Sequence, residues 1–260
     1  MIRIAALDDY QGVALEMADW SALSGRAAVE VLRDHLADPD EVVARLLPFD
    51  VACVMRERTP LPRAILERLP GLKLIVSTGR RNASIDLAAA KERGIEIMNT
   101  GYDGSSTVEL TWALILAGAR HLVLESTNLR AGGWQRTVGD NLRGKVLGVL
   151  GLGSIGAEVA RLGAAFGMDV IAWSQNLTPE SAQERGARWV SKESLFRTAD
   201  VLSIHLVLSD RTRRIVGAAE LSLDNVLATP HIGYVSRDLY ATFYEDTVAA
   251  ITRWLDALHS

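Results

Sequence analysis

The stretch Lys145-Val-Leu-Gly-Val-Leu-Gly-Leu-Gly-Ser-Ile-Gly156 decides the fold of the second half of the chain. An apolar run leads into Gly151-x-Gly153-x-x-Gly156, and apolar residues follow at helical spacing. In such a turn the first glycine allows the bend, the second admits a pyrophosphate, and the third lets helix and strand pack closely. A helix N-terminus also attracts phosphate. A structural turn is the alternative, but the context favours a dinucleotide site at Gly151, Gly153, Ser154, Ile155 and Gly156.

Length and composition describe an ordinary globular protein. The chain has 260 residues and a net charge of −4, which predicts one or two domains with a large core. No block of like charges favours nucleic acid or an anionic membrane as a partner. The N-terminus begins as a strand, and no apolar run reaches the ~18 residues that span a bilayer. We expect a soluble, cytoplasmic protein.

The single cysteine, Cys53, lies in an apolar run that is typical of a buried strand. A chain with one cysteine has no internal disulfide, as is usual in a reducing compartment. Cys53 as a nucleophile is the minor alternative, because a buried apolar thiol is usually inert. No metal site is expected.

Short β-rich runs alternate with helical patterns, which predicts an α/β fold with parallel, doubly wound sheets. The first half has strand patterns at 2–7, 28–32, 50–55, 72–77 and 95–98, with helices at 40–47, 61–69 and 85–93. In the second half, strand patterns lie at 145–150, 169–173, 187–190 and 200–206, with helices at 154–166, 179–185 and 192–197. An amphipathic helix at 237–258 ends the chain.

The glycine-rich segment 101–104 interrupts this pattern and indicates a crossing between domains. Ser106-x-x-Glu109 then opens a long apolar helix that extends to about residue 121. A catalytic role for Glu109 is possible in principle. A capping box, in which the glutamate bonds the backbone of the serine N-cap, is the favoured interpretation.

Four stretches together resemble the D-isomer-specific 2-hydroxyacid dehydrogenases. They are the glycine turn, Leu74-Ile-Val-Ser-Thr-Gly-Arg-Arg-Asn-Ala-Ser-Ile-Asp86, Asp200-Val-Leu-Ser-Ile-His205 and Thr229-Pro-His-Ile-Gly233. The resemblance implies a flavodoxin-like substrate domain at 1–103 with 237–260, and a Rossmann-type dinucleotide domain at 104–236. It also implies hydride transfer between NAD or NADP and a small 2-keto or 2-hydroxy acid, such as glyoxylate or hydroxypyruvate, in a homodimer.

In this family a histidine transfers the proton, a glutamate orients that histidine, and an arginine holds the substrate. His231 in Pro-His-Ile-Gly matches the histidine, and an imidazole suits proton transfer near neutral pH. A histidine merely hydrogen-bonded at a strand end is the alternative. His205, which also ends a strand, either lines the cofactor site or is structural.

The resemblance also places substrate contacts in the first half of the chain. Thr78 and Gly79 fall where the family holds a carboxylate with backbone N–H groups, although an ordinary turn fits equally well. Arg56 and Arg58 follow a strand and could meet a carboxylate. Solvated side chains are the slightly favoured alternative for both arginines.

Two motifs of the family are absent: Asn-x-x-Arg-Gly with its arginine, and Asp-Val-x-x-x-Glu-Pro with its glutamate. The chain passes from Leu221 directly to Ser222, which implies the loss of ~30 residues or more, the size of a βαβ unit. Residues 225–229 could then pair with the exposed edge of strand 200–206. An artificial junction is the alternative, and a Cα separation above ~3.8 Å would reveal it.

Loss of the glutamate would deprive His231 of tautomer control and of support for its charged form. A dinucleotide-binding protein without activity, such as a cofactor sensor, is therefore the second hypothesis.

The cofactor preference is read from the end of the second strand after the glycine turn. NAD-selective sites carry an acid there, whereas this chain has Ser174 and Gln175. Neutral side chains remove the repulsion of a 2′-phosphate, but no adjacent arginine attracts it. We expect tolerance of NADP alongside NAD.

Overall fold

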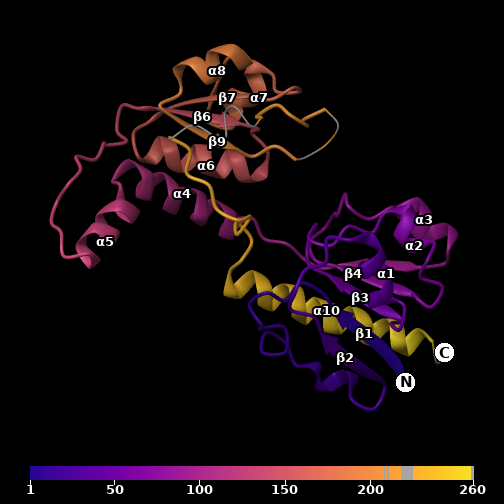
Figure 1. The fold of residues 1–260 in the computed structure, drawn as a ribbon. Coiled ribbons are helices and arrows are strands. Elements are labelled where there is room, and N and C mark those ends of the chain that lie inside the picture. The colour runs from indigo at the N-terminus through magenta and orange to yellow at the C-terminus, as the bar shows by residue number, and fades with distance from the viewer. Residues whose placement is uncertain (208, 210, 218–224, 259–260) are drawn as a thin grey trace. The chain divides into compact units, whose positions relative to one another are not determined.

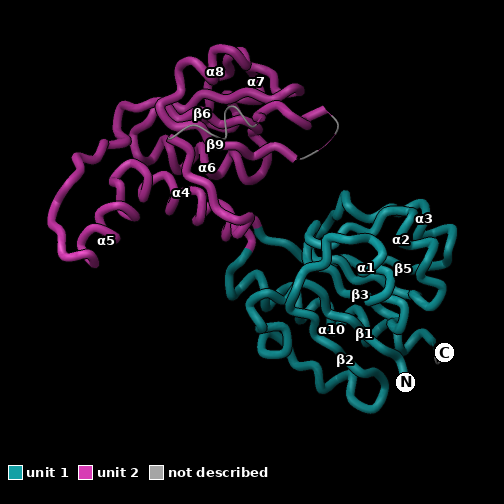
Figure 2. Tube along the Cα trace, viewed as in Figure 1, with its two compact units in different colours: residues 1–103, 235–260 teal, residues 104–234 magenta. Residues whose placement is uncertain are grey.

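The computed structural model describes residues 1–207, 209, 211–217 and 225–258. The chain divides into two compact units, Met1–Asp103 with Val235–Ser260, and Gly104–Tyr234 (Figure 2). The chain passes from unit 2 back into unit 1 after Tyr234, two residues before the boundary predicted between 236 and 237. The junction between Leu221 and Ser222 lies outside the described residues.

Unit 1 is built on a five-stranded parallel sheet with the order β2-β1-β3-β4-β5. This order is that of flavodoxin-like folds, so the predicted fold is confirmed. The strands are β1 (Ile2–Ala6), β2 (Ala27–Val31), β3 (Val51–Val54), β4 (Leu74–Ser77) and β5 (Glu96–Asn99). Every residue of β3 and β4 is buried, because helices cover both faces of the sheet.

The two faces of this sheet have separate cores. On one face the core includes Leu46, Leu66 and Ala89, from α1 (Pro39–Leu46), α2 (Arg63–Leu66) and α3 (Leu87–Glu92). The other face packs against α10 (Arg237–Ala257) and the 3-10 helix η1 (Trp20–Leu23) (Figure 1). Cys53 lies in this second core, where burial raises the pKa of its thiol to about 12 and keeps it uncharged.

Unit 2 contains a four-stranded parallel sheet with the order β8-β7-β6-β9. The strands are β6 (Val146–Leu150), β7 (Asp169–Trp173), β8 (Arg188–Trp189) and β9 (Val201–Ile204). One core joins the sheet to α4 (Ser105–Ala119), α6 (Ser154–Ala165) and α7 (Pro179–Glu184). A second core joins it to α8 (Lys192–Thr198) and to the segment with Ile215 and Val216. The predicted parallel α/β class is confirmed.

The start of α4 differs from the prediction. The helix begins at Ser105, and its N-cap is Gly104, which has no side chain to act as a cap. Ser106 and Glu109 therefore lie inside the helix, and the capping-box interpretation of Glu109 was wrong. Because the helix begins earlier than predicted, Thr107 lies on it. The Thr107 hydroxyl donates to the Gly233 carbonyl at 3.1 Å.

A second helix, α5 (Leu122–Arg130), follows α4 and was not predicted. His121 separates the two with a left-handed backbone, φ +50°, and no glycine or proline marks the break. In the described part of the chain no single helix is long and apolar enough to cross a membrane. Helices α4 and α5 together have the length and composition of a membrane span, but the pair is bent by 65°.

β9 forms one edge of the unit 2 sheet and pairs with β6, from Leu147↔Val201 to Leu150↔Ile204. Residues 225–229, which the structure describes, form no strand. The predicted pairing of 225–229 with this edge was therefore wrong, and the side chain of Ile204 is 46% exposed.

Candidate functional site

The glycine turn between β6 and α6 has two positions that the fold itself restricts to glycine. Gly151 has φ +100°, and a Cβ there would lie 2.8 Å from the His205 carbonyl oxygen. A Cβ on Gly156 would lie 2.0 Å from the Gly151 carbonyl oxygen. At Gly153 a Cβ would meet nothing within 4 Å. The second glycine is thus free of the fold's own packing and leaves the backbone open to a ligand.

The N-terminus of α6 follows this open position. Gly153 is the N-cap and provides no side-chain cap, and the first intrahelical bond runs from the Ala157 N–H to the Gly153 carbonyl at 2.9 Å. No described group accepts a hydrogen bond from the N–H of Ser154, Ile155 or Gly156. Free N–H groups at the positive end of a helix dipole fit a pyrophosphate.

Hydrogen bonds join the glycine turn to the ends of both neighbouring strands. The Gly151 N–H donates to the Trp173 carbonyl at 2.9 Å, and the His205 N–H donates to the Leu150 carbonyl at 2.8 Å. Ser174 and Gln175, which follow Trp173, therefore lie beside the turn. The structure thus brings together the cofactor-site residues predicted from the end of β7 and from His205.

The imidazole of His205 forms a hydrogen bond with Ser203 and is partly buried. Its Nε2 lies 2.8 Å from the Ser203 hydroxyl. Burial lowers the pKa of His205 to about 4, so the ring is neutral at physiological pH. A neutral ring can act as a hydrogen-bonding group but adds no positive charge to the site.

An arginine from a distant segment reaches the end of β7. The Gln175 Nε2 donates to the Arg211 carbonyl at 2.8 Å, and the Arg211 Nη2 donates to the Asn176 Oδ1 at 3.1 Å. No arginine is adjacent to Ser174 and Gln175 in the sequence, but the structure places Arg211 beside them. Arg211 is 35 residues from Asn176 in the sequence, and no local pattern signals the contact.

A second cation braces the glycine turn. Arg185 follows α7, and its Nη1 donates to the Leu152 carbonyl at 2.5 Å. Leu152 lies between the first two glycines, so this bond fixes the turn that the cofactor would contact. No sequence motif marks Arg185 as part of this turn.

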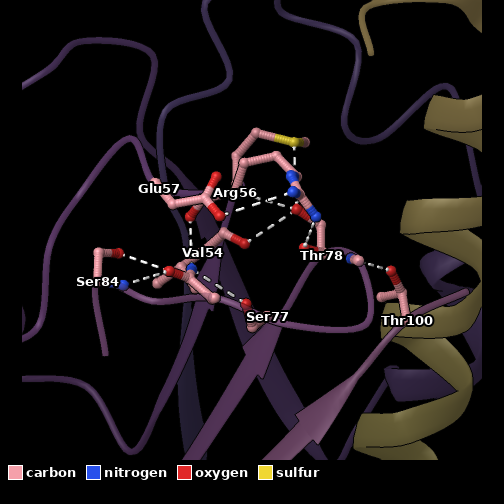
Figure 3. A network of polar contacts seen from close by, with 10 residues as sticks. Val54, Arg56, Glu57, Ser77, Thr78, Ser84 and Thr100 are labelled. Carbon is pink, nitrogen blue, oxygen red and sulfur yellow. Dashed lines mark hydrogen bonds and ion pairs between the residues drawn. The ribbon is translucent and has the colours of Figure 1, made fainter. Parts of the chain in front are cut away.

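In unit 1, Arg56 is embedded in a network at the carboxyl ends of β3 and β4 (Figure 3). Its N–H donates to the Thr78 Oγ1 at 2.8 Å, and its Nη1 donates to the Thr78 carbonyl at 3.2 Å. The Asn82 Nδ2 donates to the Arg56 carbonyl at 2.6 Å, and the guanidinium lies 5.2 Å from the Tyr102 ring centroid. With 20% of the side chain exposed, the solvated interpretation of Arg56 was wrong.

Arg58 is also fixed rather than solvated. Its Nη1 donates to the Asp8 carbonyl at 2.6 Å and its Nη2 to the Tyr240 hydroxyl at 3.2 Å. The guanidinium lies 4.3 Å from the Tyr10 ring centroid. These contacts connect the ends of β1 and β3 to α10, which gives Arg58 a structural role.

The backbone N–H groups predicted to hold a carboxylate are already bonded within unit 1. The Thr78 N–H donates to the Val54 carbonyl at 3.1 Å, and the Gly79 N–H donates to the Thr100 hydroxyl at 2.8 Å. The next N–H groups, those of Arg80 and Arg81, have no acceptor among the described residues. No sequence motif marks these two N–H groups, although they directly follow a strand end, where ligands of open α/β sheets bind.

Gly79 allows the guanidinium of Arg56 to approach these free N–H groups. Its φ is +82°, and a Cβ there would lie 1.8 Å from the Arg56 Nη1. A positive charge and unbonded N–H groups at one sheet edge are the chemistry that holds a carboxylate.

His231 lies in unit 2, on the segment that returns toward α10. Its backbone has φ +54°, and its N–H donates to the Thr229 carbonyl at 2.8 Å. Its ring lies edge-on to the Tyr234 ring, with the two ring centroids 5.2 Å apart. The bond from Thr107 to Gly233 ties this segment to α4. Within the described ranges no carboxylate forms an ion pair with the exposed His231 imidazole.

Comparison with known proteins gives the class that this fold and glycine turn define. Residues 112–223 match the NAD-binding domain of the D-isomer specific 2-hydroxyacid dehydrogenases. The crystal structure of a phosphoglycerate oxidoreductase from Vibrio cholerae O395 is 30% identical, with a TM-score of 0.90 over 99% of this chain and 100% of that one. The chain belongs to the D-isomer specific 2-hydroxyacid dehydrogenase family, and the predicted resemblance is confirmed.

Two curated relatives are similar to this chain over part of their length. A glyoxylate reductase of Aeropyrum pernix is 41% identical over 169 residues, 61% of this chain and 50% of the relative. A hydroxypyruvate reductase of Thermotoga maritima is 34% identical over 203 residues, 77% of this chain and 65% of the relative. The chain thus spans between half and two thirds of these relatives.

Proposed function

We propose that the chain is an NAD(P)-dependent oxidoreductase that transfers a hydride between the nicotinamide and C2 of a small 2-keto or 2-hydroxy acid. The observation that carries this proposal is the glycine turn, where Gly153 is open and the following N–H groups of α6 are unbonded. The glyoxylate and hydroxypyruvate reductases among the relatives support the substrate class. Unit 2 is the proposed dinucleotide domain and unit 1 the proposed substrate domain.

The cofactor contacts that we propose come from the ends of three neighbouring strands. The backbone of Gly151, Gly153, Ser154, Ile155 and Gly156 receives the pyrophosphate, and Ser174 and Gln175 face the adenosine ribose. His205 lines the same site as a neutral hydrogen-bonding group. The bound nicotinamide supplies the hydride chemistry.

The substrate carboxylate is assigned to the sheet edge of unit 1. Arg56 provides the positive charge, and the N–H groups of Arg80 and Arg81 provide donors. Thr78 positions the Arg56 guanidinium, and Gly79 gives it room. His231, whose imidazole is exposed, is assigned as the group that gives or takes the proton.

We further propose a homodimer that forms through α5 and the segment after it. Apolar side chains are exposed there: Val123 at 67%, Leu129 at 59% and Trp134 at 73%. A cluster of exposed apolar side chains commonly marks an interface. A second copy of the chain is the occupant expected from the family.

The test of the activity uses His231→Gln beside His35→Gln as a matched control. His35 lies in unit 1, where its Nδ1 is 3.3 Å from the Asp8 carboxylate. With NADH or NADPH and glyoxylate or hydroxypyruvate, we expect His231→Gln to lower kcat about 100-fold or more, the usual range for a lost proton-transfer group. Cofactor binding, followed by tryptophan fluorescence, should not change. A wild-type chain that binds cofactor but reduces no 2-keto acid would favour the cofactor-sensor hypothesis instead.

A further inference from the structure

We infer that Arg211 makes this cofactor site prefer the 2′-phosphorylated dinucleotide, so that NADPH binds more tightly than NADH. The inference rests on the proposed function, because it requires a dinucleotide at the glycine turn. It adds a specificity-determining residue that lies outside the strand–turn–helix motif.

The adenosine ribose of a bound dinucleotide belongs at the end of β7. In a Rossmann-type site the residue that meets the ribose 2′ position ends the strand after the glycine turn. That strand is β7, and the bond from the Gly151 N–H to the Trp173 carbonyl at 2.9 Å fixes its end beside the turn. The 2′ position therefore falls near residues 174–176.

The end of β7 carries no charge of its own. Ser174, Gln175 and Asn176 are all neutral, so none of these three side chains offers a carboxylate to bind the ribose hydroxyls or to repel a phosphate. The one charged group bonded to these residues in the described part of the chain is the Arg211 guanidinium, through the Asn176 Oδ1 at 3.1 Å.

Arg211 is held at the end of β7 by several contacts. Its carbonyl accepts from the Gln175 Nε2, which anchors the segment to the end of β7. The adjacent Thr212 hydroxyl donates to the Val207 carbonyl at 2.7 Å and accepts from the Ser209 N–H at 2.8 Å. Ile215 and Val216, like Trp173, pack against the core that contains Leu150 and Ile171. These contacts hold Arg211 and Thr212 at the end of the sheet.

The guanidinium keeps donors available for a ligand. Asn176 accepts one hydrogen bond from it, and no carboxylate among the described residues pairs with it. A planar guanidinium matches phosphate oxygens with parallel N–H bonds. Arg185, the other cation near the turn, is bonded to the Leu152 carbonyl and serves the backbone.

The test measures binding of fragments by calorimetry, so it needs no turnover. The probes are 2′,5′-ADP and 5′-AMP, with NADPH and NADH as full cofactors. The variants are Arg211→Ala and, as the matched control, Arg197→Ala. Arg197 lies on α8 in the same unit, is 72% exposed, and pairs with Glu193. Both variants remove one surface arginine and change the net charge equally.

We expect the wild-type chain to bind 2′,5′-ADP about tenfold or more tightly than 5′-AMP, the effect of a charge-assisted bond. Arg211→Ala should remove about tenfold of that preference while leaving 5′-AMP binding within about twofold. Arg197→Ala should leave both affinities unchanged. Arg211→Lys should retain part of the preference, since it keeps the charge but not the planar donor pair.

Equal binding of the two fragments, or an equal loss of both in Arg211→Ala, would overturn the inference and leave Arg211 as a brace for the β7 end. NADH binding without any preference for NADPH would overturn the inference alone. If none of the four ligands binds, the proposed function is overturned as well.

Discussion

Gly153 and Gly156 occupy the same turn for different physical reasons. Gly156 faces the Gly151 carbonyl oxygen so closely that a Cβ would lie 2.0 Å from it, whereas Gly153 faces open space. The spacing in the sequence identifies all three glycines of the turn but does not separate the packing role from the ligand role. The structure separates them and makes the two roles testable.

Gly156→Ala should destabilise the fold, and Gly153→Ala should weaken cofactor binding. Overpacking typically costs ~1–3 kcal/mol, and an Ala in place of an N-cap Gly costs at most about 1 kcal/mol. Urea unfolding and an NADPH titration on both variants check this. Wild-type cofactor affinity in Gly153→Ala would show that no ligand approaches this backbone.

Arg56→Lys should weaken substrate binding without affecting the cofactor. The lysine keeps the charge but cannot reproduce the fixed guanidinium beside Thr78 and Gly79. We expect the KM for the 2-keto acid to rise about tenfold, with the Kd for NADH unchanged. Arg68→Lys, at an exposed pair with Asp40, is the control. An unchanged KM in Arg56→Lys would remove Arg56 from the substrate site.

Single residues were predictable from the sequence where a local motif surrounds them, as with Gly151, Gly153 and Gly156. Arg211 and the free N–H groups of Arg80 and Arg81 were not. The contact of Arg211 depends on how a distant segment folds back on β7. The Thr78 and Gly79 N–H groups already bond to Val54 and Thr100, and sequence does not reveal which backbone groups such bonds use.

His205, which directly follows β9, couples the stability of the fold to pH. Burial lowers the pKa of His205 from 6.5 to about 4. Between these values the unfolded chain binds the proton more readily than the folded chain does, so stability falls as pH decreases from about 6.5 to about 4. The contribution of His205 is fully present above that window.

His205→Gln should therefore reduce the loss of stability on acidification. Urea midpoints measured at about pH 7 and about pH 5 should differ less in the variant than in the wild-type chain. His35→Gln, a change in unit 1, provides the comparison. The same pH dependence in His205→Gln and wild type would show that the folded state does not suppress protonation of His205.

The strands were predictable because both faces of each sheet are covered, which produces apolar runs such as those of β3, β4 and β6. The break between α4 and α5 was not predictable, since it occurs at His121 in a left-handed conformation without glycine or proline. The failed pairing of 225–229 with β9 has a similar cause: an available edge does not determine which segment covers it.

At the scale of the whole molecule, the exposed apolar surface of α5 predicts self-association. Val123→Asp, which places a charge at a side chain 67% exposed, should convert a dimer to a monomer with little effect on unfolding. Light scattering coupled to size exclusion measures the mass. Leu87→Asp, at a side chain 62% exposed on α3, is the control and should leave the mass unchanged. A dimer that persists in Val123→Asp would place the interface elsewhere.

The family and the two-unit architecture lead us to expect hydride transfer by a chain that spans only part of its curated relatives. The measurement is transfer of deuterium from C4-deuterated NADPH or NADH to glyoxylate or hydroxypyruvate, followed by mass spectrometry of the product. We predict one deuterium at C2 of the 2-hydroxy acid, and its loss in His231→Gln. Cofactor binding with no labelled product from either acid would contradict the account.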